Sequence, residues 1–302
     1  MGGWKTCIRN QLIDVRGCVE PGNDRRQALL DGELVRLSTS HALGRDAFDA
    51  LRIHQQHWAR AYCVGLSMRK AVLTGRASAY LNDMWVANTP LDQVHAVLKS
   101  VPPRQAWPSG VVYIQRTLTE DQIRRGTAMS TTTTLQTFFD IARIDGFAHA
   151  LVAADWLVKF GDYTPAQLQK LVELSPRFTG KPVARRAAAC ASTLPDSAPE
   201  SYARGLLLAA GFTDVRANVT LTEWGYRVDL LIDGWLVIEI DGLVKYDDTT
   251  YGPAQEALLN EKKRADRIGN AGFPILRFSP SYLERHPDKF IATVRERWRR
   301  GR

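Results

Sequence analysis

The chain has 302 residues, of which 45% are hydrophobic and 24% charged, so its length allows about two domains with apolar cores. It contains no apolar run of the ~20 residues that a membrane span needs. Its first residues lack the apolar region of a secretory signal, so we expect a cytoplasmic protein with no membrane partner. The formal net charge of +8 favours a polyanionic partner, because cationic side chains release counterions from nucleic acid.

Residues 1–60 are predicted to be polar and helical, with one clear feature. A helix that begins near Arg25 ends at Gly32, a residue suited to the left-handed position after a helix, and a short β-prone segment follows it. This order indicates a helix followed by a wing. We therefore interpret residues 1–60 as a partial, degenerate winged-helix segment.

Residues 61–194 are predicted to form a mostly helical domain without a catalytic cluster. Apolar spacing and cap residues predict one strand over 110–117 and helices over 67–80, 131–143, 145–160, 164–174 and 181–193. His95 and His149 are isolated in this block, which favours surface or hydrogen-bonded side chains over metal ligands. The cysteines also lack the spacing of a zinc site, so we expect reduced thiols at Cys7, Cys18, Cys63 and Cys190.

The composition of residues 193–199 indicates a linker, after which helices alternate with strands. Strands are predicted near 214–221, 226–232, 235–241 and 274–278, and helices over 198–210, 253–271 and 287–300. This alternation predicts an α/β domain over 195–302, in which helices flank a mixed sheet.

The hairpin over residues 226–242 carries three acids whose positions depend on its turn. A two-residue turn at Asp233 and Gly234 pairs residue 229 with 238 and separates Asp229 from Glu239. A three-residue loop, Ile232 to Gly234, pairs residue 229 with 237 instead. Asp229, Glu239 and Asp241 then share one face, and the apolar residues align on the other. We favour the three-residue loop for that reason.

Three carboxylates on one face repel one another, so a bound cation is the simplest reason for the cluster. Mg²⁺ and Mn²⁺ prefer oxygen ligands, and a metal ion held this way can activate water for hydrolysis of a phosphodiester. The alternative is a surface hairpin with solvated acids, but both of its strands are apolar on two faces.

The acid hairpin and its flanking motifs resemble the PD-(D/E)XK nuclease fold. More narrowly, they are similar to proteins of actinobacteria and phages that are related to very-short-patch-repair endonucleases. The motifs in chain order are SAPESYAR (197–204), RVD (227–229), VIEIDG (237–242), KY (245–246), EKKR (261–264) and GFPILRF (272–278). The resemblance implies a restriction-endonuclease-like domain that hydrolyses DNA with Mg²⁺ or Mn²⁺, in phage defence or DNA repair, with Asp229, Glu239 and Asp241 as metal ligands. Asp241 stands where the parent motif has Lys, which leaves the general base open.

A weaker resemblance covers the first part of the chain. Residues 32–36 and the block 61–190 look like the antitoxin region of AbiEi type that precedes such domains in abortive-infection systems. It implies a protein partner bound through the N-terminal region.

Other residues of the C-terminal domain have two interpretations each. Glu200 could complete the metal site, or it could close a capping box with Ser197. Arg204 could pair with Glu200 one helical turn away or contact phosphate. Glu261 interrupts an apolar helix stripe, and Arg264 is either its partner or a phosphate ligand.

Three further cations and the C-terminal tail complete the set of candidates. Lys245 and Lys262 could replace the missing Lys as catalytic groups, and Arg277 could approach phosphate. The basic tail over 295–302 suits either a nucleic-acid backbone or the plain preference of cations for helix C-termini.

Two functions from different classes follow. The first is a Mg²⁺- or Mn²⁺-dependent endonuclease acting on DNA, with RNA as an open alternative substrate. The second is a nuclease fold with weak or absent hydrolysis that binds nucleic acid or a protein partner as an antitoxin-type regulator. The acid triad favours the first, and the missing Lys with the antitoxin-like front half favours the second.

Overall fold

The computed structural model of the chain describes residues 3–18, 23–221, 225–240 and 272–301. The chain divides after Ile144 into two units, 1–144 and 145–302. Composition indicated a linker over 193–199, but this segment lies inside the second unit. Within the described ranges, no helix has the length and apolar character of a membrane span. All four cysteines are free thiols.

The first unit opens with a small antiparallel sheet in the order β1-β3-β2. Its strands are β1 (Ile13–Asp14), β2 (Leu34–Arg36) and β3 (His41–Gly44), and its helices are α1 (Gly3–Asn10), α2 (Asp24–Leu30) and α3 (Arg45–Asp49). The Asn23 side chain accepts backbone N–H groups at the start of α2, and Gly32 has a φ of 77° just after its end. The predicted helix and the strand after it are therefore confirmed.

A mixed five-stranded sheet follows in the first unit, in the order β6-β5-β4-β8-β7. It consists of β4 (Val72–Leu73), β5 (Val94–Leu98), β6 (Val111–Gln115), β7 (Ile123–Arg125) and β8 (Ser130–Thr132). The helices of this part are α4 (Ile53–Leu66), α5 (Gly75–Leu81) and α6 (Thr134–Ile144), with 3₁₀ turns η1 (Arg104–Ala106) and η2 (Glu120–Gln122). Of these strands, only the one over 110–117 was predicted, so the expectation of a mostly helical block is wrong up to residue 132.

The helix expected over 67–80 is confirmed only over 75–80, for a local reason. Helix α4 ends at Leu66, the chain forms β4, and α5 begins at Gly75 with a φ of 59°. That left-handed conformation cannot occur inside a right-handed helix, and it is one that glycine adopts without steric cost.

The second unit begins with four helices, α7 (Phe147–Lys159), α8 (Pro165–Leu174), α9 (Lys181–Cys190) and α10 (Ala198–Ala209). All four lie where helices were predicted. Helices α7 and α10 approach closely at Gly205, where an added Cβ would lie 2.9 Å from the Cα of Ala148. The α7–α10 pair therefore depends on glycine at this position.

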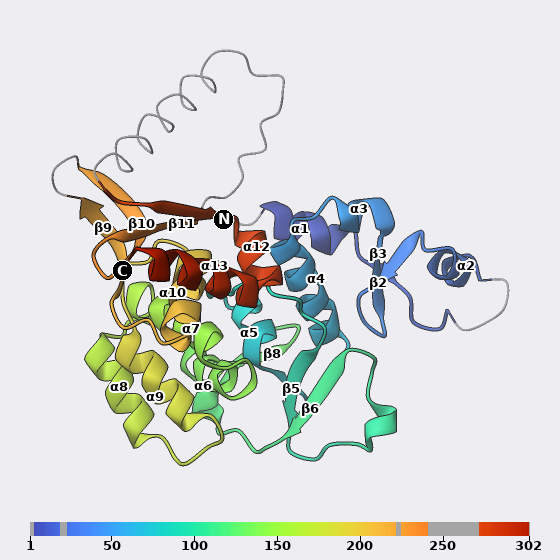
Figure 1. The fold of residues 1–302 in the computed structure, drawn as a ribbon. Coiled ribbons are helices and arrows are strands. Elements are labelled where there is room, and N and C mark those ends of the chain that lie inside the picture. Colours follow the sequence, from blue (N-terminus) through green and yellow to red (C-terminus); the bar gives the residue numbers. More distant parts are fainter. Residues whose placement is uncertain (1–2, 19–22, 222–224, 241–271, 302) are drawn as a thin grey trace. The chain divides into compact units, whose positions relative to one another are not determined.

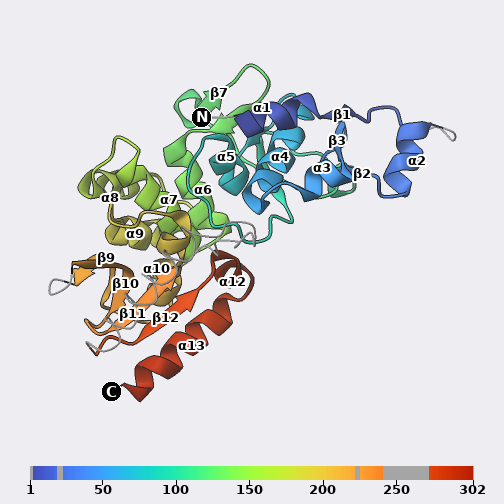
Figure 2. The ribbon, with the colours of Figure 1, turned by 90° about the horizontal axis from the view of Figure 1, so that it is seen from above.

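The sheet of the second unit has the order β12-β11-β10-β9. It contains β9 (Val215–Leu221), β10 (Tyr226–Ile232), β11 (Leu236–Ile240) and β12 (Ile275–Phe278), and the helices α12 (Pro280–Arg285) and α13 (Pro287–Arg300) follow it. β12 runs parallel to β11, whereas the other pairs are antiparallel. Helices α10 and α13 lie on the same side of this sheet (Figure 1), and Figure 2 shows the order of its strands. The predicted α/β class with a mixed sheet and helices is confirmed for this unit.

Candidate functional site

A row of polar residues crosses the second unit's sheet from edge to edge. The residues on either side of Asp229 pair with β9, and this register puts Asp229 opposite Asn218. When the hairpin register between β10 and β11 is continued by one residue, Asp229 also lies opposite Glu239. Glu239 in turn pairs with Arg277 of the parallel strand β12. We call Asn218, Asp229, Glu239 and Arg277 the polar row. Residues directly opposite on antiparallel strands have Cα atoms about 4.5 to 5.5 Å apart, so these positions adjoin.

The polar row contrasts with the row beside it. That row consists of apolar residues only: Ala217, Leu230, Ile238 and Leu276. Ala217, Leu230 and Ile238 are at most 3% exposed. Charged residues placed in such a sheet lose hydration, which is costly unless a partner or a ligand compensates them.

The hairpin register differs from the expected one by two residues. Ile232 pairs with Leu236, so the three-residue loop consists of Asp233, Gly234 and Trp235. Asp233 and Gly234 have φ values of 48° and 75°, and the Trp235 N–H donates to the Ile232 carbonyl at 3.1 Å. Asp and Gly tolerate this left-handed conformation better than Ile does, which places the loop one residue later. A shift by two keeps the parity of the strands, so Asp229 and Glu239 still belong to one row.

Glu239 is the most deeply buried acid of the row, at 3% exposure. Its Oε2 lies 3.4 Å from Nη2 of Arg277, whose side chain is 37% exposed. Asp229 accepts a hydrogen bond from the Ile240 N–H through Oδ2, at 2.7 Å. The Asp229 carboxylate is therefore held against the backbone of the strand that carries Glu239.

The row joins helix α10 through Asn218, a residue that sequence analysis did not single out. Its φ of 50° interrupts β9 opposite Asp229. Its amide donates to Oε2 of Glu200 at 3.1 Å, and its Oδ1 accepts from Nε of Arg227 at 3.0 Å. The available signal was an asparagine inside a predicted strand, since strands are depleted in Asn and since Asn tolerates the left-handed region.

Glu200 belongs to the cap of α10, as one of its two interpretations proposed, but its carboxylate reaches the Ser197 hydroxyl and the Asp196 N–H instead of the Ser197 N–H of a full capping box. Its backbone N–H donates to Oγ of Ser197 at 3.3 Å, and its Oε1 accepts from the same hydroxyl at 2.7 Å. Oε2 also accepts from the Asp196 N–H at 2.9 Å. Glu200 therefore connects the start of α10 with Asn218 of the polar row, and its catalytic role stays a prediction.

Arg204 corrects the expected pair with Glu200. Its Nη1 lies 3.2 Å from Oδ2 of Asp155 on α7, and a second nitrogen donates to the Cys190 carbonyl. Arg204 is 9% exposed, and Asp155 is fully buried. The guanidinium therefore compensates a buried carboxylate among α7, α9 and α10, which disfavours the expected phosphate contact.

Asp155 itself interrupts the apolar run of α7. Burial raises its pKa to about 6, although Arg204, the Ser201 hydroxyl and the Ser192 N–H each favour the charged form. Ser201 donates to Oδ2 at 2.6 Å and Ser192 to Oδ1 at 2.8 Å. The acid is thus fully occupied by structural contacts.

Asp241, Lys245, Lys262 and Arg264 lie outside the described residues, as does Glu261. Among the residues that are described, no three His, Cys, Asp or Glu side chains gather as a metal site. The described carboxylates of the polar row are two, Asp229 and Glu239. The predicted sharing of one ion by three acids stays a prediction.

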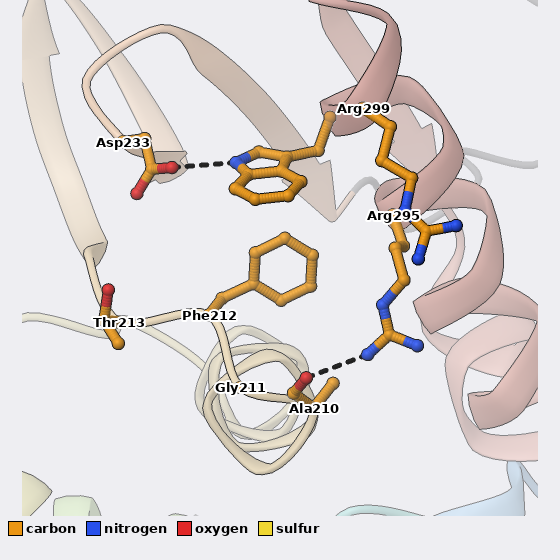
Figure 3. Close-up of a pocket in the computed structure, with 8 residues that line it drawn as sticks. Ala210, Gly211, Phe212, Thr213, Asp233, Arg295 and Arg299 are labelled. Carbon is orange, nitrogen blue, oxygen red and sulfur yellow. Dashed lines mark hydrogen bonds between the residues drawn. The ribbon is translucent and has the colours of Figure 1, made fainter. Parts of the chain in front are cut away.

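A pocket of about 290 Å³ lies at the hairpin turn, away from the polar row. Trp298 donates through Nε1 to Oδ2 of Asp233 at 2.8 Å, and Arg295 donates to the Ala210 carbonyl at 2.8 Å. Figure 3 shows the second of these bonds, between Arg295 and Ala210. Phe212 contacts the Trp298 ring edge-on, with 5.6 Å between centroids. These contacts attach α13 to the sheet.

The basic tail makes similar intramolecular contacts. Arg297 lies over the Trp235 ring at 5.7 Å, and Arg300 pairs with Glu296. Arg300 remains largely exposed in this pair, so both interpretations of the helix end stay predictions.

Comparison with family models, curated proteins and solved structures finds no match for this chain. The resemblance to nucleases rests on the motifs quoted above.

Proposed function

We propose that the second unit is a divalent-metal-dependent nuclease that hydrolyses phosphodiester bonds in DNA. The observation that carries the proposal is the polar row, in which Asp229 and Glu239 occupy neighbouring strands beside a row of buried apolar residues. A stable sheet does not need two adjoining carboxylates there. Their repulsion and lost hydration are offset most simply by a cation.

The donor set suits the metal ions that the motifs imply. Carboxylate oxygens are the preferred ligands of Mg²⁺, which commonly uses one or two carboxylates together with water. Asp229 and Glu239 would hold the ion, with Asp241 as a further ligand from outside the described residues. When bound, the ion supplies an activated water and stabilises charge on the phosphate.

The remaining residues of the row would orient the substrate and the acids. Arg277 adjoins Glu239 and is partly exposed, so its guanidinium is placed to neutralise a phosphate oxygen. The Ile240 N–H fixes Asp229, and the Asn218 amide keeps Glu200 beside the row. In the overall reaction, water adds across one P–O bond and gives a phosphate monoester and a free hydroxyl.

The second candidate is a nuclease fold that binds nucleic acid or a protein partner without hydrolysis. One observation favours it: Arg277 and the Ile240 N–H compensate the two acids without any metal ion. The resemblance to antitoxin-type proteins points in the same direction. Under this proposal the chain acts as a regulator in phage defence, not as a DNA repair or restriction enzyme.

One experiment separates the two candidate functions. The protein is incubated with supercoiled plasmid, linear duplex DNA, single-stranded DNA and RNA, each in the presence of Mg²⁺ or Mn²⁺. We expect the wild type to cut at least one DNA substrate. We expect Glu239→Gln and Asp229→Asn to lose more than the roughly 10- to 100-fold that outer-shell changes cost a metal site. Both changes keep the shape of the side chain, so the sheet should remain folded by circular dichroism.

Two exposed acids of the second unit supply matched controls. Asp214 pairs with Arg216 beside the sheet, and Glu296 pairs with Arg300 on α13. Asp214→Asn and Glu296→Gln should cut like the wild type. A wild type that binds DNA but cuts none of the substrates would move the conclusion to the second candidate. Undiminished cleavage by Glu239→Gln would contradict the polar row as the catalytic site.

A further inference from the structure

A second pocket, of about 350 Å³, lies within the first unit and has no part in the proposed nuclease site. It is formed by α1, α4, the end of α5 and the β7–β8 hairpin. The residues that matter for its chemistry are Lys5, Arg9, Asn82, Asp83, Arg124 and Thr127. We refer to it as the cationic pocket.

Two of its cations are held on a pair of aromatic rings. Trp58 and Tyr62 stack with 4.8 Å between centroids and planes 9° apart. The Arg9 guanidinium carbon lies 5.6 Å from the Trp58 centroid and 5.1 Å from the Tyr62 centroid. Lys5 Nζ lies 5.7 Å from the Trp58 centroid. Cation–π contacts fix the position of a cation without neutralising its charge.

The third cation is held by a buried amide. Arg124 donates through Nη1 to Oδ1 of Asn82 at 2.8 Å. The Asn82 amide nitrogen donates to Oγ of Ser78 at 3.0 Å and to the Thr132 carbonyl at 3.1 Å. Asn82 is 8% exposed, so this network gives the pocket a rigid polar wall. Such preorganisation lowers the entropy that a ligand must offset.

Positive charge is in excess in the cationic pocket. Asp83 is the carboxylate among its lining residues, and it pairs with Lys5. Within the described residues, no salt bridge links Arg9 or Arg124 to an acid. The guanidinium edges of both arginines remain for a ligand, because a ring face or a single hydrogen bond occupies only part of each group.

We infer that the cationic pocket binds a phosphate ester, with Arg9 and Arg124 as its principal ligands and Lys5 as the third cation. The planar fork of arginine suits phosphate oxygens, and the net charge of +8 favours phosphate-bearing partners. The ester has two sources, a free nucleotide or a nucleic-acid strand that passes the exposed rim at Gly126, Thr127 and Ala128. This inference does not depend on hydrolysis at the polar row.

The test uses the full chain with EDTA, so that no divalent metal at the polar row contributes to binding. Calorimetry measures AMP, and anisotropy measures a labelled single-stranded DNA of about 12 nucleotides, a length within the range of known single-strand sites. We expect the double variant, Arg9→Gln with Arg124→Gln, to lower the affinity for the bound probe roughly 10-fold or more. The salt dependence of that affinity should fall by the equivalent of about one phosphate contact or more.

Arg104→Gln is the matched control, because Arg104 also lies over a tryptophan, Trp107, at 5.8 Å, but outside the pocket. It should bind within about twofold of the wild type, since it removes one distant charge. Thr127→Glu is a second variant that leaves all three cations in place. It puts a negative charge on an exposed rim residue, so it should abolish binding with an unchanged melting temperature.

Each outcome decides the inference. Tight binding of AMP assigns the pocket to a free nucleotide, whereas binding of the oligonucleotide alone assigns it to a strand. The inference is overturned if the wild type binds neither probe, if Arg104→Gln loses as much as the double variant, or if Thr127→Glu binds normally.

Discussion

Glu239 and Arg277 stand opposite one another on neighbouring parallel strands, with 3.4 Å between Oε2 and Nη2. The acid is almost fully buried, whereas the arginine reaches solvent. Arginine at this position therefore neutralises a carboxylate that the surrounding sheet cannot hydrate. A metal ion bound to the same carboxylate would compete with that interaction, which makes the pair a probe of the proposed site.

We predict that Arg277→Met lowers stability and makes it depend more strongly on divalent metal. Loss of the partner leaves the Glu239 charge less compensated, at a cost of about 1 to 3 kcal/mol for this partly exposed pair. Added Mg²⁺ or Mn²⁺ should raise the melting temperature of the variant more than that of the wild type, because a metal ion that binds the folded state stabilises it. Equal metal effects in both proteins, measured by thermal denaturation, would contradict the metal site at Glu239.

We predict that Arg204→Met is among the most destabilising single changes in the second unit. It leaves the fully buried Asp155 without its cation, and breaking such a pair costs about 3 to 5 kcal/mol. Arg185→Met is the control, since Arg185 pairs with Glu173 on the surface and should contribute about 1 kcal/mol or less. Urea denaturation of the two variants measures the difference, and similar losses would show that Asp155 does not need Arg204.

The raised pKa of Asp155 predicts a specific pH dependence. Its folded pKa of about 6 exceeds the ordinary value of 3.8 because the site is buried. The folded state then binds the proton more tightly, so this contribution to stability is complete below about pH 4 and is lost as the pH rises through 6. The difference in unfolding free energy between wild type and Asp155→Asn should therefore fall by about 2 to 3 kcal/mol from pH 4 to pH 7. A constant difference across that range would show that burial does not control the titration.

Local patterns predicted the second unit well. Alternating apolar residues identified β10 and β11, and the Ser197 and Glu200 spacing identified the cap of α10. The turn register was displaced by two residues because apolar alignment alone cannot tell registers of equal parity apart. Backbone preference decided it, since the left-handed positions fall on Asp233 and Gly234.

Contacts between distant segments were not accessible to the same reasoning. Helical spacing offered Glu200 as the partner of Arg204, whereas the actual partner, Asp155, lies on another helix. In the first unit, β4 has only two residues, too few for an alternation to show. Asn218 illustrates the same limit. It lies beside Glu200, Arg227 and Asp229, and these residues come together only after the sheet forms.

The contact between Trp298 and Asp233 predicts how α13 is attached. Trp298→Phe keeps the ring against Phe212 but removes the donor to Oδ2 of Asp233. The cost should be about 1 kcal/mol, since Asp233 is partly exposed and water can replace the indole. Hydrogen exchange should quicken in α13 and leave α7 unchanged. Faster exchange in both helices would mean that α13 is not attached independently.

The buried His57 predicts acid sensitivity of the first unit. Burial first, and then the nearby Arg76, Arg60 and His54, lower its pKa to about 4. The unfolded chain takes up a proton near the ordinary value of 6.5, whereas the folded state resists it. This contribution to stability is therefore present above pH 6.5 and is lost as the pH falls towards 4, with a limit of about 3 kcal/mol.

His57→Gln isolates that effect. Glutamine does not titrate, and it can still reach the Tyr80 hydroxyl, which lies 2.9 Å from Nδ1 of His57. The variant should lose some stability at pH 7 through imperfect packing, but its stability should decline less between pH 6.5 and 4 than that of the wild type. Hydrogen exchange of peptides from α4 and α5 locates the change in the first unit, with His286→Gln on the second unit as the control. Parallel decline of wild type and His57→Gln would assign the acid sensitivity to other groups.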